Sequence, residues 1–117
     1  MVVGQDSGVD ADRLFQALAD GTRRDILAVA VGDGCSVSAL ATRYPMSFAA
    51  VQKHVAVLEG AGLVTKERRG REQLVRTDVG AVQGVRALLD DIEEMWRARV
   101  SRIDDLLADE QRTTGGK

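Results

Sequence analysis

The sequence has very little of the residue types that build metal sites, disulfides and active sites. Its 117 residues include one cysteine, one histidine and one proline, and aromatic residues make up 3% of the chain. Soft and borderline metal ions need several thiolate or imidazole ligands, so we expect no metal site. A single cysteine, Cys35, forms no internal disulfide, which fits a reducing cytoplasm. No nucleophile stands beside a base and no phosphate loop is present, so we expect neither enzyme activity nor a cofactor.

Long apolar runs are also missing, which argues against a membrane span. The first ten residues have no basic start and no apolar stretch, so they do not resemble a secretory signal. The composition is 44% hydrophobic and 29% charged, as in soluble globular proteins. We therefore expect a cytoplasmic protein with one domain and a modest core.

Charge is distributed unevenly along the chain, although the formal net charge is only −2. Residues 43–76 hold seven basic and three acidic side chains, a balance of +4, whereas residues 1–42 and 77–117 each sum to −3. A basic segment between acidic ends can steer a polyanion to one surface. Chance clustering on a solvated face explains the charges equally well at this point.

The spacing of apolar residues predicts a mainly helical fold with a two-stranded hairpin over residues 10–109. Flexible tails are expected at residues 1–9 and 110–117 because both are rich in polar residues and glycine. The first helix is predicted over residues 10–19. A second helix follows, for which we expect Thr22 as the N-cap.

Residues 36–60 have the pattern of a helix-turn-helix. Ser36 is expected to cap a short third helix, and Pro45 ends it because proline cannot continue a helix. Ser47 is expected to cap a longer fourth helix with one buried face and one face free for the DNA major groove. The DNA contacts predicted on this recognition helix are Ser47, Phe48, Ala49, Gln52, Lys53 and His54.

The chemistry of these side chains suits DNA to different degrees. Gln52 can pair with adenine, and Lys53 can pair with guanine or a phosphate. Phe48 has two open interpretations, contact with a thymine methyl group or packing against the third helix. His54 has no ligand partner nearby, so we interpret it as making a structural hydrogen bond or a phosphate contact.

Residues 63–77 are predicted to form a hairpin, or wing, that directly follows the recognition helix. Its strands are rich in β-branched residues, and Arg69-Gly70-Arg71 forms the turn. Arginines at such a tip contact phosphates or enter the minor groove. The predicted wing and phosphate contacts are Arg43, Lys66, Arg68, Arg69 and Arg71.

A last helix, predicted over residues 79–108, is longer than a domain of this size can cover, because it spans roughly 45 Å. Part of its apolar stripe therefore needs a second chain, and we expect a homodimer formed through the terminal helices. The acidic pairs on its other faces are interpreted as solvated. The predicted interface residues are Leu14, Leu88, Leu89, Ile92, Met95, Trp96, Ile103 and Leu106.

The chain resembles the ArsR (arsenical-resistance repressor) family of dimeric bacterial winged helix-turn-helix regulators. The resemblance rests on LFQALADGTRRDIL at 14–27, on SVSALATRYPMSFAAVQKHVAVLEGAGLV at 36–64 and on the basic hairpin, and it covers about residues 12–108. It implies a homodimer that represses its own or a neighbouring operon by binding an inverted repeat in double-stranded DNA. Members of the family are often released from DNA by an inducer, and which small molecule would act on this chain is left open.

Two departures from the family pattern narrow this expectation. Members commonly have proline where this chain has Gly21. Metal-sensing members carry a Cys-x-Cys-type pair on the third helix or His and acidic clusters on the last helix, and this chain has neither thiols nor histidines there. The resemblance is therefore to the branch without metal-site cysteines. The alternatives are a protein–protein interaction module without DNA binding, and a ligand- or redox-responsive sensor that uses Cys35.

Overall fold

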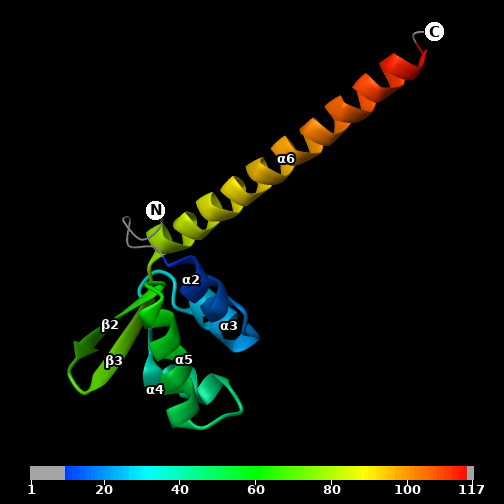
Figure 1. Ribbon diagram of the computed structural model, residues 1–117. Helices are drawn as coiled ribbons and strands as arrows, with labels where there is room; N and C mark the ends of the chain where they lie inside the picture. Colours follow the sequence, from blue (N-terminus) through cyan, green and yellow to red (C-terminus); the bar gives the residue numbers. More distant parts are fainter. Residues whose placement is uncertain (1–9, 116–117) are drawn as a thin grey trace. The chain divides into compact units, whose positions relative to one another are not determined.

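The computed structural model describes residues 10–115 of the chain, so the tail predicted at residues 1–9 lies outside the described residues. The described residues form five helices and three strands in an order typical of a winged helix-turn-helix (Figure 1). The helices are α2 (Ala11–Leu18), α3 (Gly21–Val29), α4 (Val37–Arg43), α5 (Phe48–Gly60) and α6 (Val79–Gly115). The strands are β1 (Cys35–Ser36), β2 (Val64–Arg69) and β3 (Glu72–Thr77).

The chain divides into two compact units, Met1–Gln83 and Gly84–Lys117. The first unit holds α2 to α5, the sheet and the first residues of α6. The second unit consists of the remainder of α6. No helix in the described residues combines the length and the apolar character that crossing a membrane requires.

The corner between α2 and α3 differs from the prediction in its capping residue. Asp20, and not Thr22, is the N-cap of α3: its extended backbone lets the carboxylate accept a hydrogen bond from the Arg23 backbone N–H at 3.1 Å. Aspartate is a stronger N-cap than threonine, so α3 begins earlier, at Gly21. The expectation of Thr22 as the cap was wrong.

Two arginines that follow this corner satisfy the carbonyl groups at the end of α2. Arg23 Nε donates to the Ala17 carbonyl at 2.7 Å, and Arg23 Nη2 donates to the Gln16 carbonyl at 2.9 Å. Arg24 Nη1 donates to the Leu18 carbonyl at 2.6 Å. The last carbonyls of a helix have no partner within the helix, and cations stabilise that end. The ADGTRR segment thus ends one helix and starts the next.

The sheet has three antiparallel strands in the order β1-β3-β2, one more than the predicted hairpin. β2 and β3 pair from Val64↔Thr77 to Arg69↔Glu72, and the two-residue strand β1 pairs with the other edge of β3. Gly34 allows this approach: its φ is +90°, and a Cβ there would lie 2.6 Å from the Val75 carbonyl oxygen. A strand as short as β1 has no alternation that the sequence could reveal.

The core of the first unit lies between α3, α4, α5 and the sheet. Burying a large aliphatic side chain stabilises a fold by roughly 1.5–3 kcal/mol. The buried side chains of α5 therefore determine which face of this helix lies against the core. Within this unit α4 and α5 pack against each other and against the hairpin (Figure 1). The largest fully buried side chains are Ile26, Leu40, Val51, Val55, Leu58, Leu63 and Val75.

The helix α6 continues past its predicted end at Ala108 and ends at Gly115. Residues 110–115, expected to belong to a flexible tail, are therefore helical. The apolar periodicity stops at Leu107, but residues 110–112 (Glu, Gln, Arg) are good helix formers, and Arg112 forms an ion pair with Asp109 one turn earlier. At the other end, the Asp78 side chain accepts a hydrogen bond from the Ala81 backbone N–H at 3.1 Å.

Thr77 attaches the end of the wing to α3, and its replacement by valine tests that link. Its hydroxyl donates to the Leu27 carbonyl at 2.7 Å, and the side chain is 7% exposed. Thr77→Val keeps the shape but loses this donor, so we expect the free energy of unfolding to fall by about 1–2 kcal/mol. Urea unfolding measures the change. The exposed Thr65 of β2 provides the matched control, Thr65→Val, and equal effects of the two variants would contradict the assigned role.

Candidate nucleic-acid interface

The two helices of the helix-turn-helix begin at the predicted serine caps. Ser36 Oγ accepts a hydrogen bond from the Ala39 backbone N–H at 3.0 Å, and Ser47 Oγ accepts one from the Ala50 backbone N–H at 3.1 Å. Both predicted N-caps are confirmed. Because each hydroxyl accepts a backbone hydrogen bond, each fixes the start of its helix.

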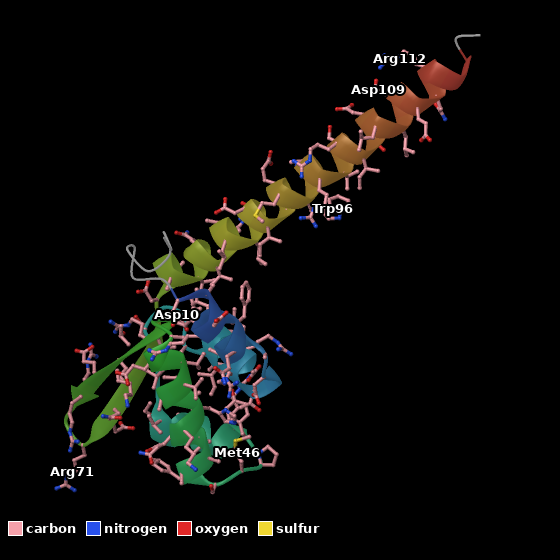
Figure 2. All side chains as sticks on the ribbon, in the orientation of Figure 1. Asp10, Met46, Arg71, Trp96, Asp109 and Arg112 are labelled. Carbon is pink, nitrogen blue, oxygen red and sulfur yellow. The ribbon has the colours of Figure 1, made fainter. Side chains whose placement is uncertain are left out.

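The recognition helix α5 has one buried face and one exposed face. Val51, Val55 and Leu58 are buried, whereas Ala49, Gln52 and Lys53 are exposed. This division leaves the predicted DNA-reading side chains free on the first two turns of the helix. The end of the first unit that carries the turn before α5, marked by Met46, also carries the hairpin tip, marked by Arg71 (Figure 2).

A groove of about 290 Å³ joins the start of α5 to the wing. Phe48 and Gln52 line it from α5, and Arg68 and Arg71 line it from the hairpin, so the structure brings these four predicted residues together. Phe48 is 45% exposed and shares the groove with Val37 of α4. The groove also has lining residues that the sequence did not single out, Ser38, Glu72 and Gln73.

The wing carries the remaining predicted cations, and their partners differ. Lys66 pairs with Glu59 at 3.2 Å, and Arg69 Nε lies 3.8 Å from a Glu67 carboxylate oxygen. Within the described residues, Arg68 and Arg71 have no ion pair. The Arg71 side chain stands at the hairpin tip and points away from the sheet (Figure 2). The groove arginines Arg68 and Arg71 are thus the wing cations without an ion pair in the described residues, and Glu72 is the one carboxylate that lines the groove with them.

Arg43, predicted as a phosphate contact, belongs to a cluster that holds the turn before α5. Its Nε lies 3.0 Å from Asp25 Oδ2, and the Tyr44 hydroxyl donates to the same oxygen at 2.6 Å. Hydrogen bonds from Tyr44 and Arg43 lower the pKa of Asp25, and burial together with the hydrogen bond to Asp25 raises the pKa of Tyr44 to about 12. The cluster ties α3 to the end of α4, and a DNA phosphate would have to compete with Asp25 for Arg43.

His54 lies on the flank of α5 that faces the corner between α2 and α3. Its Nδ1 is 3.2 Å from Arg23 Nη1, and since that arginine only donates, the ring nitrogen accepts. The same guanidinium therefore caps α2 and contacts the recognition helix. Of the two interpretations of His54, the geometry matches the structural hydrogen bond.

The predicted interface residues fall into two groups. Leu14 is only 5% exposed in the single chain, so it has almost no surface left for a partner, which does not support its assignment to the interface. Phe15 is the exposed large apolar residue of α2. Leu88 is half-buried. The other predicted residues are exposed along α6, namely Leu89, Ile92, Met95, Trp96, Ile103 and Leu106.

The fold and the site together define a winged helix-turn-helix DNA-binding protein. Residues 18–67 match the family described as a helix-turn-helix domain. The chain is 34% identical over 99 residues to the HTH-type transcriptional regulator Rv2034 of Mycobacterium tuberculosis, covering 85% of this chain and 90% of that protein.

Solved structures give the same assignment. An ArsR-like transcriptional regulator from Rhodococcus sp. RHA1 is 33% identical, with a TM-score of 0.74 over 89% of this chain and 96% of that chain. The homodimeric winged helix-turn-helix DNA-binding domain of Mb0332 from Mycobacterium bovis is 25% identical, with a TM-score of 0.61 over 80% of this chain and 88% of that chain. The chain belongs to the ArsR family of winged helix-turn-helix transcriptional regulators.

The Tyr44–Asp25 hydrogen bond gives a pH-dependent prediction, because Tyr44 is the only tyrosine of the chain. The pKa of Tyr44 is raised from 10.0 to about 12, so the stability that this phenol contributes is complete below pH 10. It is then lost as the pH rises toward 12. Tyr44→Phe should lower the free energy of unfolding by about 1 kcal/mol at neutral pH.

The difference between the wild type and Tyr44→Phe should shrink above pH 10. Tyrosinate absorbance follows the titration directly, and Tyr44→Phe supplies the blank. A titration midpoint near the ordinary value of 10.0 would contradict the bond.

Proposed function

We propose that the chain is a cytoplasmic homodimeric repressor that binds an inverted repeat in double-stranded DNA near its own or a neighbouring operon. The observation that carries the proposal is the groove in which Phe48 and Gln52 of the recognition helix meet Arg68 and Arg71 of the wing. A surface that joins base-reading side chains to two arginines without an ion pair suits DNA better than a protein partner.

In this proposal the two elements of the groove read different parts of the duplex. The exposed face of α5 lies in the major groove, where Gln52 and Lys53 contact base edges. The wing arginines contact phosphates or the adjacent minor groove. Phosphate contacts position the protein, and base contacts supply the sequence preference.

The homodimer is supported by the homodimeric Mb0332 domain and by the exposed apolar residues of α6. A two-fold dimer presents two recognition helices, which matches an inverted repeat. The proposal includes release by a small-molecule inducer and not by a metal ion. The described residues contain no group of three or more His, Cys, Asp or Glu side chains placed to hold a metal.

A mobility shift with the region upstream of the gene tests DNA binding. If several phosphates are contacted, affinity for DNA should fall roughly 10³-fold or more between 50 and 200 mM salt. The reason is that Lys and Arg side chains release counterions from the phosphates they contact, and this release is less favourable at high salt. Arg71→Ala should reduce this salt dependence. A scrambled duplex of equal length is the control. Absence of binding at low salt would contradict the proposed repressor function and favour the alternative, a protein–protein interaction module without DNA binding.

Alanine variants separate the two proposed kinds of contact. Gln52→Ala and Lys53→Ala should reduce discrimination between the operator and a scrambled duplex, at a cost of about 1–3 kcal/mol for a base contact. Arg71→Ala should weaken binding to both duplexes alike. Arg13→Ala, which removes an exposed charge of α2, is the matched control and should leave both affinities unchanged. The assignment fails if Gln52→Ala and Arg71→Ala behave identically.

A further inference from the structure

Arg23 lies where three helices of the first unit meet. α2 and α3 both pack against the recognition helix α5 (Figure 1). Arg23 is the third residue of α3, and its guanidinium contacts the end of α2 and the flank of α5. One side chain therefore joins both supporting helices to the helix that carries the predicted DNA-reading residues.

Each nitrogen of the Arg23 guanidinium donates to a neutral acceptor. Nε lies 2.7 Å from the Ala17 carbonyl oxygen, and Nη2 lies 2.9 Å from the Gln16 carbonyl oxygen. Nη1 lies 3.2 Å from His54 Nδ1. Because the guanidinium is a rigid plane, the two bonds to α2 fix the direction in which the third nitrogen points. The bond to His54 is therefore set by the end of α2 and not by the flexible stem of the arginine.

His54 meets this donor in one chemical form. A guanidinium has no acceptor, so Nδ1 presents its lone pair, and the proton of the neutral ring lies on Nε2. The ring is half-buried. Among the described residues, the buried side-chain nitrogen without a partner is Arg76 Nε, so His54 Nε2 is reached by water. The imidazole is thus held at one nitrogen and solvated at the other.

The position of His54 in α5 makes this bond relevant to DNA. Lys53 precedes it and is exposed, whereas Val55 follows it and is buried. Apolar packing has no direction of its own, so burial of Val55 tolerates small rotations of α5 about its axis. A hydrogen bond, in contrast, depends on both distance and angle. The contact with Arg23 therefore restricts the rotation that aims Gln52 and Lys53.

We propose that Arg23 is the residue that positions the recognition helix, and that it acts through Nδ1 of His54. The inference rests on the DNA binding of the proposed function and adds a residue that sets its sequence preference without touching DNA. Base contacts require side chains that are held closely in place, whereas the wing arginines meet phosphates from a separate element. Loss of Arg23 should therefore reduce discrimination between sequences more than it reduces affinity for DNA in general.

Arg24 supplies a matched control, because it caps the same end of α2. Its Nη1 donates to the Leu18 carbonyl at 2.6 Å, and in the described residues it forms no hydrogen bond to α5. Arg23→Ala should lower the preference for the duplex from the upstream region over a scrambled duplex roughly tenfold, because the reading side chains lose one hydrogen bond that holds them. Arg24→Ala should leave the preference unchanged. Equal losses in the two variants would show a role in helix capping alone and overturn the inference.

Variants of His54 test whether the effect passes through Nδ1. Asparagine places a carbonyl oxygen where histidine has Nδ1, so His54→Asn should keep the wild-type preference, whereas His54→Leu should lose it as Arg23→Ala does. The double variant Arg23→Ala, His54→Leu should be no worse than either single variant, because all three lack the same contact. Losses that add in the double variant would contradict the inference. Circular dichroism and urea unfolding establish that each variant is folded.

Nitrogen NMR of the imidazole reads the contact without DNA, since His54 is the only histidine of the chain. In the neutral ring, wild-type Nδ1 should give the resonance of an unprotonated nitrogen that accepts a hydrogen bond. Arg23→Ala should shift this resonance and admit the second tautomer, whereas Arg24→Ala should leave it in place. Identical His54 spectra in the wild type and Arg23→Ala would rule out the positioning contact.

The outcomes separate this inference from the proposed function. A wild type that prefers the upstream duplex, together with an Arg23→Ala variant that prefers it equally, contradicts only the positioning role. A wild type that binds neither duplex at low salt contradicts the proposed function, and the inference fails with it.

Discussion

The orientation of α5 depends on the burial of one of its faces, and the DNA-binding surface depends on that orientation. Val51, Val55 and Leu58 are buried in the core, and as a consequence Gln52 and Lys53 of the same helix are exposed. Hydrophobic burial has no directionality of its own. The direction comes from helical periodicity. Because the apolar residues of α5 share one face of the helix, the polar residues between them lie on the opposite, exposed face.

Polar contacts from the first half of α3 add the precision that apolar packing lacks. At its start, Arg23 links the end of α2 to His54 on the recognition helix. Within α3, Asp25 holds Tyr44 in the turn that leads into α5. Two of these side chains are arginines that already have partners within the fold, so basic residues in this protein serve two separate purposes. Arg23 and Arg43 hold the scaffold together, and Arg68 and Arg71 remain available for a polyanion.

Local patterns in the sequence predicted most of the elements. Ser36, Ser47 and Pro45 mark the helix-turn-helix by chemistry that acts within a few residues. Several features that the sequence did not reveal involve distance along the chain or competition between residues. The pairing of Cys35 with Val75 and the bond from Tyr44 to Asp25 join residues far apart in the chain, and the choice of Asp20 over Thr22 was decided by two capping residues in competition. In the same way, the sequence shows that Arg43 is basic but not that it forms an ion pair with Asp25, eighteen residues earlier in the chain.

The short strand β1 has a mechanical consequence. Ser36 pairs with Leu74 in the sheet and also caps α4, so one residue belongs both to the wing and to the helix-turn-helix. The hairpin and the helix-turn-helix are therefore connected through Ser36, so a change in the orientation of one shifts the other. A change that displaced this two-residue strand would therefore act on the hairpin and on the start of α4 together.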